Sequence, residues 1–136
     1  MVVFKINGQD FSSMVLKIER SANKLDKYAE RTIDGDLKRE VIGTYLNYKL
    51  SFGNSTYQKK KYNQMFLGLI RPIDFVKVTI PVNGKNYTFE GYISNVQDNI
   101  VYISDKDQIY EGLSCDIVTR KPTWKAGYDS PSLDQF

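Results

Sequence analysis

The residues whose spacing comes nearest to reaction chemistry are the carboxylates of two short turns, at 34–36 (Asp-Gly-Asp) and 105–107 (Asp-Lys-Asp). Two aspartates one residue apart begin the calcium loop of an EF-hand. The first turn lacks a glutamate at the twelfth loop position, and the second has Tyr110 where the sixth position requires glycine. We therefore interpret both as solvated turns, with calcium binding as the lesser alternative, and we expect no metal site and no cofactor.

Other catalytic groups are scarce. The 136 residues include no histidine and one cysteine, Cys115. A Ser-His-Asp triad is therefore impossible, and no glycine-rich phosphate loop occurs. Cys115 cannot form an internal disulfide and is typical of a small buried residue, which favours folding in a reducing compartment. We predict that the protein is not an enzyme.

The charge pattern gives little support to nucleic-acid binding. Nineteen basic residues against sixteen acidic ones give a net charge of +3, and the only basic cluster is three lysines at 59–61. With Tyr57 and Tyr62 they resemble a surface that stacks bases and neutralises phosphates. Three lysines on a helix flank are more often a solvated face, and no second basic cluster joins them. We expect no specific nucleic-acid partner.

The chain also has no pattern typical of a membrane protein. No run approaches the roughly 18 apolar residues of a membrane span, and the first residues turn polar too soon for a secretory signal. At this length we expect a single soluble domain over residues 1–120, followed by a C-terminal tail over 121–136.

Period-two alternation predicts most of the elements. Residues 38–52 form the longest such run, which predicts a half-buried strand. Residues 76–80 and 87–94 alternate in the same way, and the Asn83-Gly84 dipeptide between them is a strong hairpin signal. One face of the long run carries Ile42, Thr44, Leu46, Tyr48, Leu50 and Phe52.

The remaining strand predictions are shorter. Residues 2–6 and 14–19 both alternate, and we expect them to form an opening hairpin around Asn7-Gly8. Further strands are expected at 100–104 and 109–119, on either side of the turn at 105–107. Residues 21–31 are polar without a clean period, so we expect a loop there.

One helix is predicted near residues 56–70. Residues 53–55 (Gly-Asn-Ser) end the preceding strand and offer an N-cap oxygen, and the helix must stop before Pro72. Its single apolar stripe should pack on the sheet. The stripe consists of Tyr62, Met65, Phe66 and Leu69.

Two glycines, Gly43 and Gly91, fall inside predicted strands. A glycine there indicates a bulge, a close backbone approach or curvature of the sheet. We favour curvature.

The C-terminal tail has no helix or strand period, yet it carries three large aromatic residues, Trp124, Tyr128 and Phe136. A solvated tail does not usually contain so many rings. We therefore expect these three residues to contact another surface and treat them as candidates for contacts between subunits.

Together these elements predict a mainly β (α+β) protein, an antiparallel β-sandwich or partly closed barrel with one flanking helix. The order of elements from Arg31 to Pro122 resembles that of small tail proteins of tailed phages and prophages of Gram-positive bacteria. In that group an R-x-x-D-G-x-L-x-R turn precedes a strand, an aromatic F-x-G lies in a later hairpin, and W-x-G-L-S-F-x-L-I closes the domain. Here Tyr110 replaces the tryptophan and Cys115 the phenylalanine. The matching segments are 31–39 (RTIDGDLKR), 50–52 (LSF), a helix closing near 67–69, 75–81 (FVKVTIP), 87–92 (YTFEGY) and 110–117 (YEGLSCDI).

The resemblance implies a tail-tube-like β-sandwich fold and a structural role in the virion. The expected partners are other copies of the chain in an oligomeric ring and other phage tail proteins. The expected location is the tail, as a tube, adaptor or baseplate subunit made in the cytoplasm of the host bacterium. Two alternatives stay open: a head decoration or host-surface binding module, and a nucleic-acid-binding β barrel.

Overall fold

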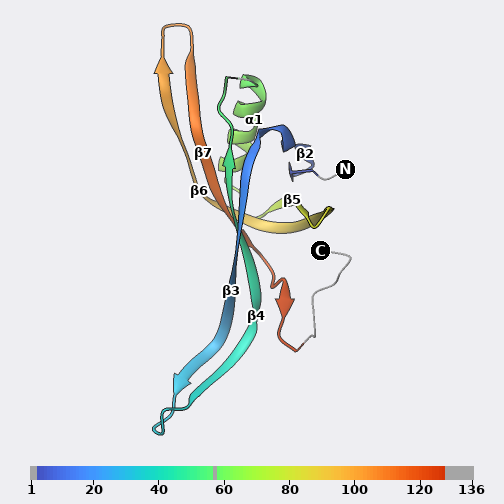
Figure 1. The fold of residues 1–136 in the computed structure, drawn as a ribbon, viewed down its shortest axis with the longest axis vertical. Coiled ribbons are helices and arrows are strands. Elements are labelled where there is room, and N and C mark those ends of the chain that lie inside the picture. The colour runs from blue at the N-terminus through green and yellow to red at the C-terminus, as the bar shows by residue number, and fades with distance from the viewer. Residues whose placement is uncertain (1–2, 57, 128–136) are drawn as a thin grey trace.

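The computed structural model describes residues 3–56 and 58–127 (Figure 1). The chain is mainly β with a single helix among the described residues, which confirms the predicted fold class. The elements are β1 (Lys5–Ile6), β2 (Gln9–Asp10), a 3-10 turn η1 (Ser12–Met14), β3 (Val15–Arg31), β4 (Leu37–Phe52), α1 (Lys59–Ile70), β5 (Val76–Val82), β6 (Lys85–Ile103), β7 (Gln108–Thr119) and β8 (Trp124–Lys125).

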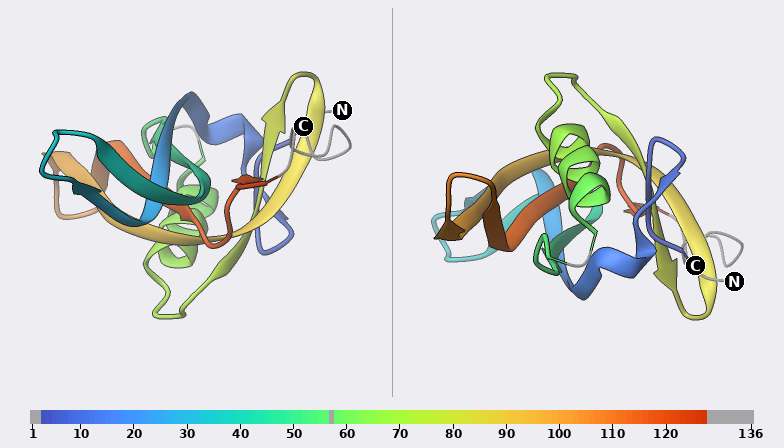
Figure 2. Two further views of the ribbon diagram at one scale, coloured as in Figure 1. Left: turned by 90° about the horizontal axis from the view of Figure 1, so that it is seen from below. Right: turned by 90° about the horizontal axis from the view of Figure 1, so that it is seen from above.

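The strands form one antiparallel sheet that is not closed. Its order is β2-β1-β5-β6-β7-β4-β3, and β8 pairs with β4 beyond the end of β7. Two hairpins, β3–β4 and β6–β7, extend toward opposite ends of the molecule and meet at a waist, where β5 and the start of β6 turn aside (Figure 1). Views along the long axis show α1 close to the middle of the molecule (Figure 2).

The hairpin from β5 to β6 forms as predicted. Asn83 and Gly84 have φ values of 51° and 78°, the left-handed pair that a tight two-residue turn requires. Along β5 the buried side chains alternate with exposed or half-buried ones. Strand β6 continues through residues 95–99, which lie between two predicted strands; Asn95 at φ 53° and two register shifts interrupt the period there.

The opening hairpin was predicted with the wrong second strand. Asn7-Gly8 does turn the chain, with φ values of 50° and 83°, but it joins β1 to the short strand β2. The run at 14–19 instead enters β3, which pairs with β4. A register shift between Val15 and Lys17 leaves Leu16 exposed and breaks the expected face.

The prediction of a loop at residues 21–31 is also wrong, because this segment is the outer half of β3. It pairs with β4 from Ser21 opposite Asn47 to Arg31 opposite Leu37. The described side chains of this half are exposed, apart from a half-buried Asp26. A strand that buries neither face needs no alternation of apolar and polar residues. The hydrophobic pattern of the sequence therefore could not predict this strand.

The helix packs on the sheet through the predicted stripe. Tyr62, Met65 and Leu69 are buried in the core, and Phe66 is half-buried against it. The predicted N-cap is wrong: the helix begins at Lys59 after Gln58, with no side-chain cap. Ser55 instead bonds to the backbone of Tyr110. No helix among the described residues is long and apolar enough to cross a membrane.

The two strand glycines are explained by close approach and not mainly by curvature. A Cβ at Gly43 would lie 2.7 Å from the carbonyl oxygen of Trp124 and 2.8 Å from Cβ of Pro122. A Cβ at Gly91 would lie 2.9 Å from Cγ2 of Ile117. Gly43 thus lets the segment after Arg120 dock beside β4 as strand β8.

Candidate assembly surface

At the waist, β6, β7, β4 and β3 lie side by side as a four-stranded antiparallel sheet. One row across it contains Tyr92, Val118, Asn47 and Ser21. On the outer side of β3 no described strand pairs, and on the outer side of β6 the pairing with β5 ends at Gly91. The waist therefore ends in an unpaired strand edge on both sides.

The direction of the β3 backbone groups follows from the contacts of β4. The carbonyl oxygens of Thr44 and Ile42 accept hydrogen bonds from Thr123 N–H (2.9 Å) and Ala126 N–H (3.0 Å). The backbone N–H and C=O groups of the even-numbered residues of β4 therefore point away from β3. The backbone groups of odd-numbered residues such as Asn47 point toward β3, where Asn47 pairs with Ser21. The next residue, Ala22, points its N–H and C=O toward the free edge.

We call the outer part of the β3–β4 hairpin, residues 23–41, the lower arm. The hydrogen bonds and ion pairs of its described side chains stay within the hairpin, for example Arg39 to Asp26 at 2.6 Å. Apolar side chains are exposed on it, and Ile33 at its tip is fully exposed. Leu25 and Leu37 are exposed as well.

We call the outer part of the β6–β7 hairpin, residues 97–111, the upper arm. Residues 100–103 (Ile-Val-Tyr-Ile) are four consecutive apolar side chains, each 50% exposed or more. Successive side chains of a strand point to opposite faces, so both faces of this arm present apolar surface. Isolated exposed apolar residues are ordinary, but a continuous run of this kind is typical of a contact surface.

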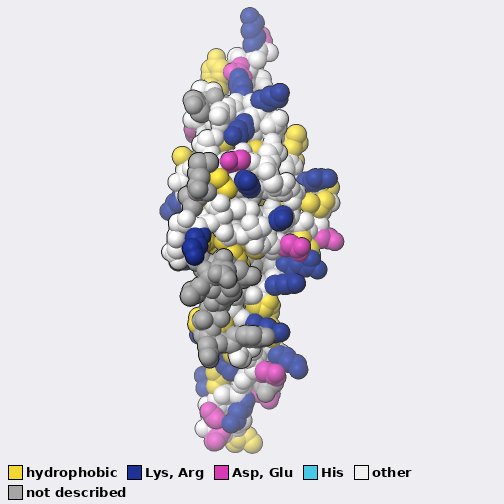
Figure 3. Space-filling view, turned by 90° about the vertical axis from the view of Figure 1, so that its right-hand side faces the viewer, with side chains coloured by type: hydrophobic (Ala, Val, Ile, Leu, Met, Phe, Trp, Pro, Cys, Tyr) yellow, Lys and Arg dark blue, Asp and Glu magenta, His cyan; other side chains and the backbone are white. Residues whose placement is uncertain are grey.

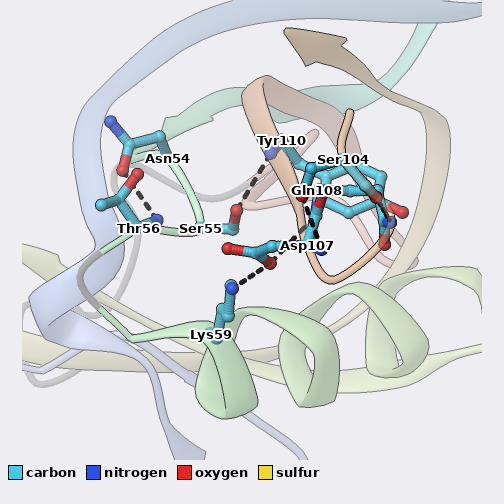
Figure 4. A network of polar contacts seen from close by, with 8 residues as sticks. All are labelled: Asn54, Ser55, Thr56, Lys59, Ser104, Asp107, Gln108 and Tyr110. Atoms are coloured by element: carbon cyan, nitrogen blue, oxygen red, sulfur yellow. Dashed lines mark hydrogen bonds and ion pairs between the residues drawn. The ribbon is translucent and has the colours of Figure 1, made fainter. Parts of the chain in front are cut away.

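The upper arm is braced against the segment that leads into α1 (Figure 4). Ser55, 2% exposed, accepts a hydrogen bond from Tyr110 N–H on its Oγ and donates its own N–H to Tyr110 O, both at 2.9 Å. Tyr62 Oη donates to Asp98 at 2.8 Å, and Lys59 pairs with Asp107. These contacts explain why Ser55 does not cap the helix.

Three buried tyrosines, Tyr48, Tyr62 and Tyr87, have raised pKa values. Burial is the main cause for Tyr48, whose pKa rises to about 12, and its hydroxyl has no hydrogen-bond partner among the described residues. Burial and then the bond to Asp98 raise the pKa of Tyr62. Burial also raises the pKa of the Cys115 thiol to about 12, which keeps it protonated and unreactive.

Aspartate carboxylates of both turns are bonded to neighbouring side chains of the same chain. Asp34 accepts a hydrogen bond from the Thr32 hydroxyl, which lowers the pKa of Asp34, and Asp36 pairs with Lys38 at 3.0 Å. In the second turn, the bond to Lys59 lowers the pKa of Asp107. Within residues 3–56 and 58–127, no group of three or more acidic or thiol side chains is placed to hold a metal ion.

The three lysines at 59–61 do not extend into a basic groove. Lys59 pairs with Asp107, and the charge of Lys61 acts on Asp10. On the face shown in Figure 3, basic side chains are spread along the whole length of the molecule, with fewer acidic ones among them. Tyr57, which the sequence placed beside these lysines, lies outside the described residues.

Of the three predicted contact aromatics, only Trp124 lies in the described part of the chain. It is 42% exposed and pairs with Thr44 as part of β8. Tyr128 and Phe136 lie outside the described residues. Sequence reasoning found the two strands of the upper arm, at 100–104 and 109–119 around the turn at 105–107, and the structure confirms them. It missed the lower arm and both free edges, although the polar run at 21–31 opposite a long strand was a usable signal for the lower arm.

Neither a scan against protein-family models nor a search of curated proteins found a match to this chain.

Proposed function

We propose that this protein is a structural subunit of a phage tail that assembles with other copies of itself into a ring. The tail assignment rests on the resemblance of residues 31–122 to small phage tail proteins. The ring rests on one structural observation, the unpaired strand edges on both sides of the four-stranded waist. Exposed sheet edges are usually blocked in monomers because they promote association.

The strand directions at the waist favour a ring. Neighbours in the order β6-β7-β4-β3 are antiparallel, so with four strands β3 runs opposite to β6. A second copy related by rotation about an axis along the strands would bring its β6 antiparallel to the β3 of the first. The same step repeats from copy to copy, whereas an odd number of strands would force a parallel junction.

The two arms would provide further contacts in such an assembly. They point to opposite ends of the molecule (Figure 1) and expose apolar side chains that the monomer does not cover. Burying an apolar side chain stabilises a contact by roughly 1.5 to 3 kcal/mol. The upper arm, with its run at 100–103, would contribute most.

A single proline substitution in β3 tests the edge pairing. Ala22→Pro removes an N–H that points to the free edge and leaves the ladder to β4 intact, a position that tolerates proline. We expect wild type and the control Ala22→Ser to form rings by negative-stain microscopy and light scattering, and Ala22→Pro to be a folded monomer. Wild type that stays monomeric at all concentrations would overturn the ring.

The tail assignment has a separate test. Antibodies against the protein should label the tails of the phage particles that carry it. Label on the head would favour the alternative of a decoration protein. Rings without any label on tails would leave self-assembly standing and refute the tail assignment.

A further inference from the structure

A cleft of about 560 Å³ opens below the waist, between β6 and the segment that follows β7. One wall is β6 at residues 87–90, and the other is residues 119–122. It forms because β7 pairs with β6 only down to Thr119 opposite Gly91. The chain then crosses to β4 and pairs there as β8, which leaves a gap in the sheet.

The β6 wall presents an unpaired strand edge to this gap. Arg120 N–H donates to the carbonyl oxygen of Glu90 at 3.0 Å, so the backbone groups of Glu90 face the β7 side. By the two-residue period, Thr88 points its N–H and C=O the same way. No described residue forms a hydrogen bond with the Thr88 backbone on that side.

The ladder to β5 uses the other residues of β6. Lys77 donates its N–H to Asn7 Oδ1 and accepts from Asn7 N–H, so its backbone faces β1. The pairs of Lys77 with Glu90 and Thr79 with Thr88 are therefore the pairs without backbone hydrogen bonds, and Thr79 and Thr88 are joined only through their hydroxyls at 2.9 Å. The backbone N–H and C=O of Thr88 can therefore bond to a new strand without breaking a hydrogen bond between β5 and β6.

The side chains around the cleft favour an acidic ligand with some apolar residues. Lys77, Arg120 and Lys121 line it against a single acid, Glu90. Arg120 pairs with Glu90 at 2.6 Å, whereas the two lysines have no ion pair among the described residues. Tyr87 and Phe89 also line the cleft, and their rings, stacked at 5.3 Å, form an aromatic wall that gives it an apolar strip.

Thr119 adds a polar group that lacks a partner. It lines the cleft, is only 5% exposed, and its Oγ1 forms no hydrogen bond within the described part of the chain. A buried hydroxyl without a partner is costly. A strand seated in the cleft would bring backbone groups close to it.

We propose that the cleft binds an extended acidic segment of a partner protein, which adds as a strand to β6 at residues 87–90. Backbone bonds to Thr88 would supply affinity, and alternate side chains would meet the lysines and the aromatic wall, as in other cases of strand addition. This site lies away from the β3 edge, so the proposal does not depend on the ring.

The test uses a blocked, fluorescent octapeptide that alternates glutamate and valine, with a lysine–valine octapeptide as its control. We expect the full-length protein to bind the acidic probe and not the basic one. Thr88→Pro, which removes the N–H in the cleft, should weaken binding about fivefold to tenfold, and Thr88→Val should leave it within about twofold. Lys77→Glu with Lys121→Glu should weaken it about tenfold and reduce its dependence on salt.

If Thr88→Pro does not fold, amide hydrogen exchange of the wild-type protein provides the test. The Thr88 amide should be protected from exchange only when the acidic probe is bound. Lack of that protection, or equal binding by Thr88→Pro and Thr88→Val, would overturn strand addition. The double variant Asp129→Lys, Asp134→Lys tests whether the chain's own acidic C-terminal segment is the occupant. Binding by this variant alone, or by neither protein, would overturn the proposal of a partner.

Discussion

The two arms are hairpins of similar design with different support. The upper arm is tied to the rest of the molecule by Ser55, Lys59 and Tyr62, whereas the described hydrogen bonds and ion pairs of the lower arm lie within its own hairpin. A two-stranded hairpin is marginally stable alone in water. The upper arm is thus held by its own chain, and in the proposed ring the lower arm would gain more order from a neighbouring copy.

The largest effect should come from the waist, where both arms begin. Leu50 is fully buried there, and Leu25 in the lower arm is half exposed. We expect Leu50→Ala to lower the free energy of unfolding by about 2 to 5 kcal/mol, because it leaves a cavity. The matched variant Leu25→Ala should cost less than about 0.5 kcal/mol in the monomer. Urea denaturation measures both, and equal losses would show that the lower arm is part of the core.

High pH should also act on the waist through Tyr48. Because the folded pKa of about 12 lies above the ordinary value near 10, the protonated form is favoured in the folded state. This contribution to the free energy of unfolding, roughly 3 kcal/mol, is fully present below pH 10 and is lost as the pH rises through 12. Tyr48→Phe should be neutral or stabilising at pH 7, since the hydroxyl has no described partner. It should also reduce the loss of stability between pH 10 and pH 12. A loss of stability unchanged in Tyr48→Phe would assign it to other groups.

The brace of the upper arm depends most on Ser55. Ser55→Ala leaves the Tyr110 N–H without its acceptor, which should cost about 1 to 3 kcal/mol. The control is Thr32→Ala at the exposed tip of the lower arm, where we expect a change within about 0.5 kcal/mol. Hydrogen exchange at Tyr110 should accelerate in Ser55→Ala alone. Unchanged exchange would mean that the arm is held by other contacts.

The smallest effect should come from the ion pair of Lys59 with Asp107. The side chains of Lys59 and Asp107 are 48% and 40% exposed, so solvent screens the pair; Lys59→Ala should change stability little, and the difference should vanish at high salt. Thermal unfolding at low and high salt measures it. A large loss that persists at high salt would show that the pair does more than steady the tip of the arm.

The sequence predicted the parts of the fold that bury a periodic face. The alternation in β5, the Asn83-Gly84 turn and the helix stripe all depend on local chemistry and on one buried side. The outer half of β3 escaped prediction because it buries neither face. The partner of the run at 14–19 was missed because strand pairing depends on the whole chain.

The candidate surface could be predicted only in part. The exposed aromatic Trp124 was found from composition, but its pairing beside Gly43 required the tertiary structure. Free edges and the gap beside Thr88 are properties of strand order, which no local pattern in the sequence encodes.

Hydrogen exchange of the β3 amides, measured above and below the concentration at which the protein assembles, tests the central claim most directly. Pairing through the free edge predicts that the outward N–H groups of Arg20, Ala22 and Lys24 become protected on assembly, while the ladder amide of Ser21 is already protected in the monomer. Assembly that leaves Arg20, Ala22 and Lys24 exchanging as fast as in the monomer would contradict it.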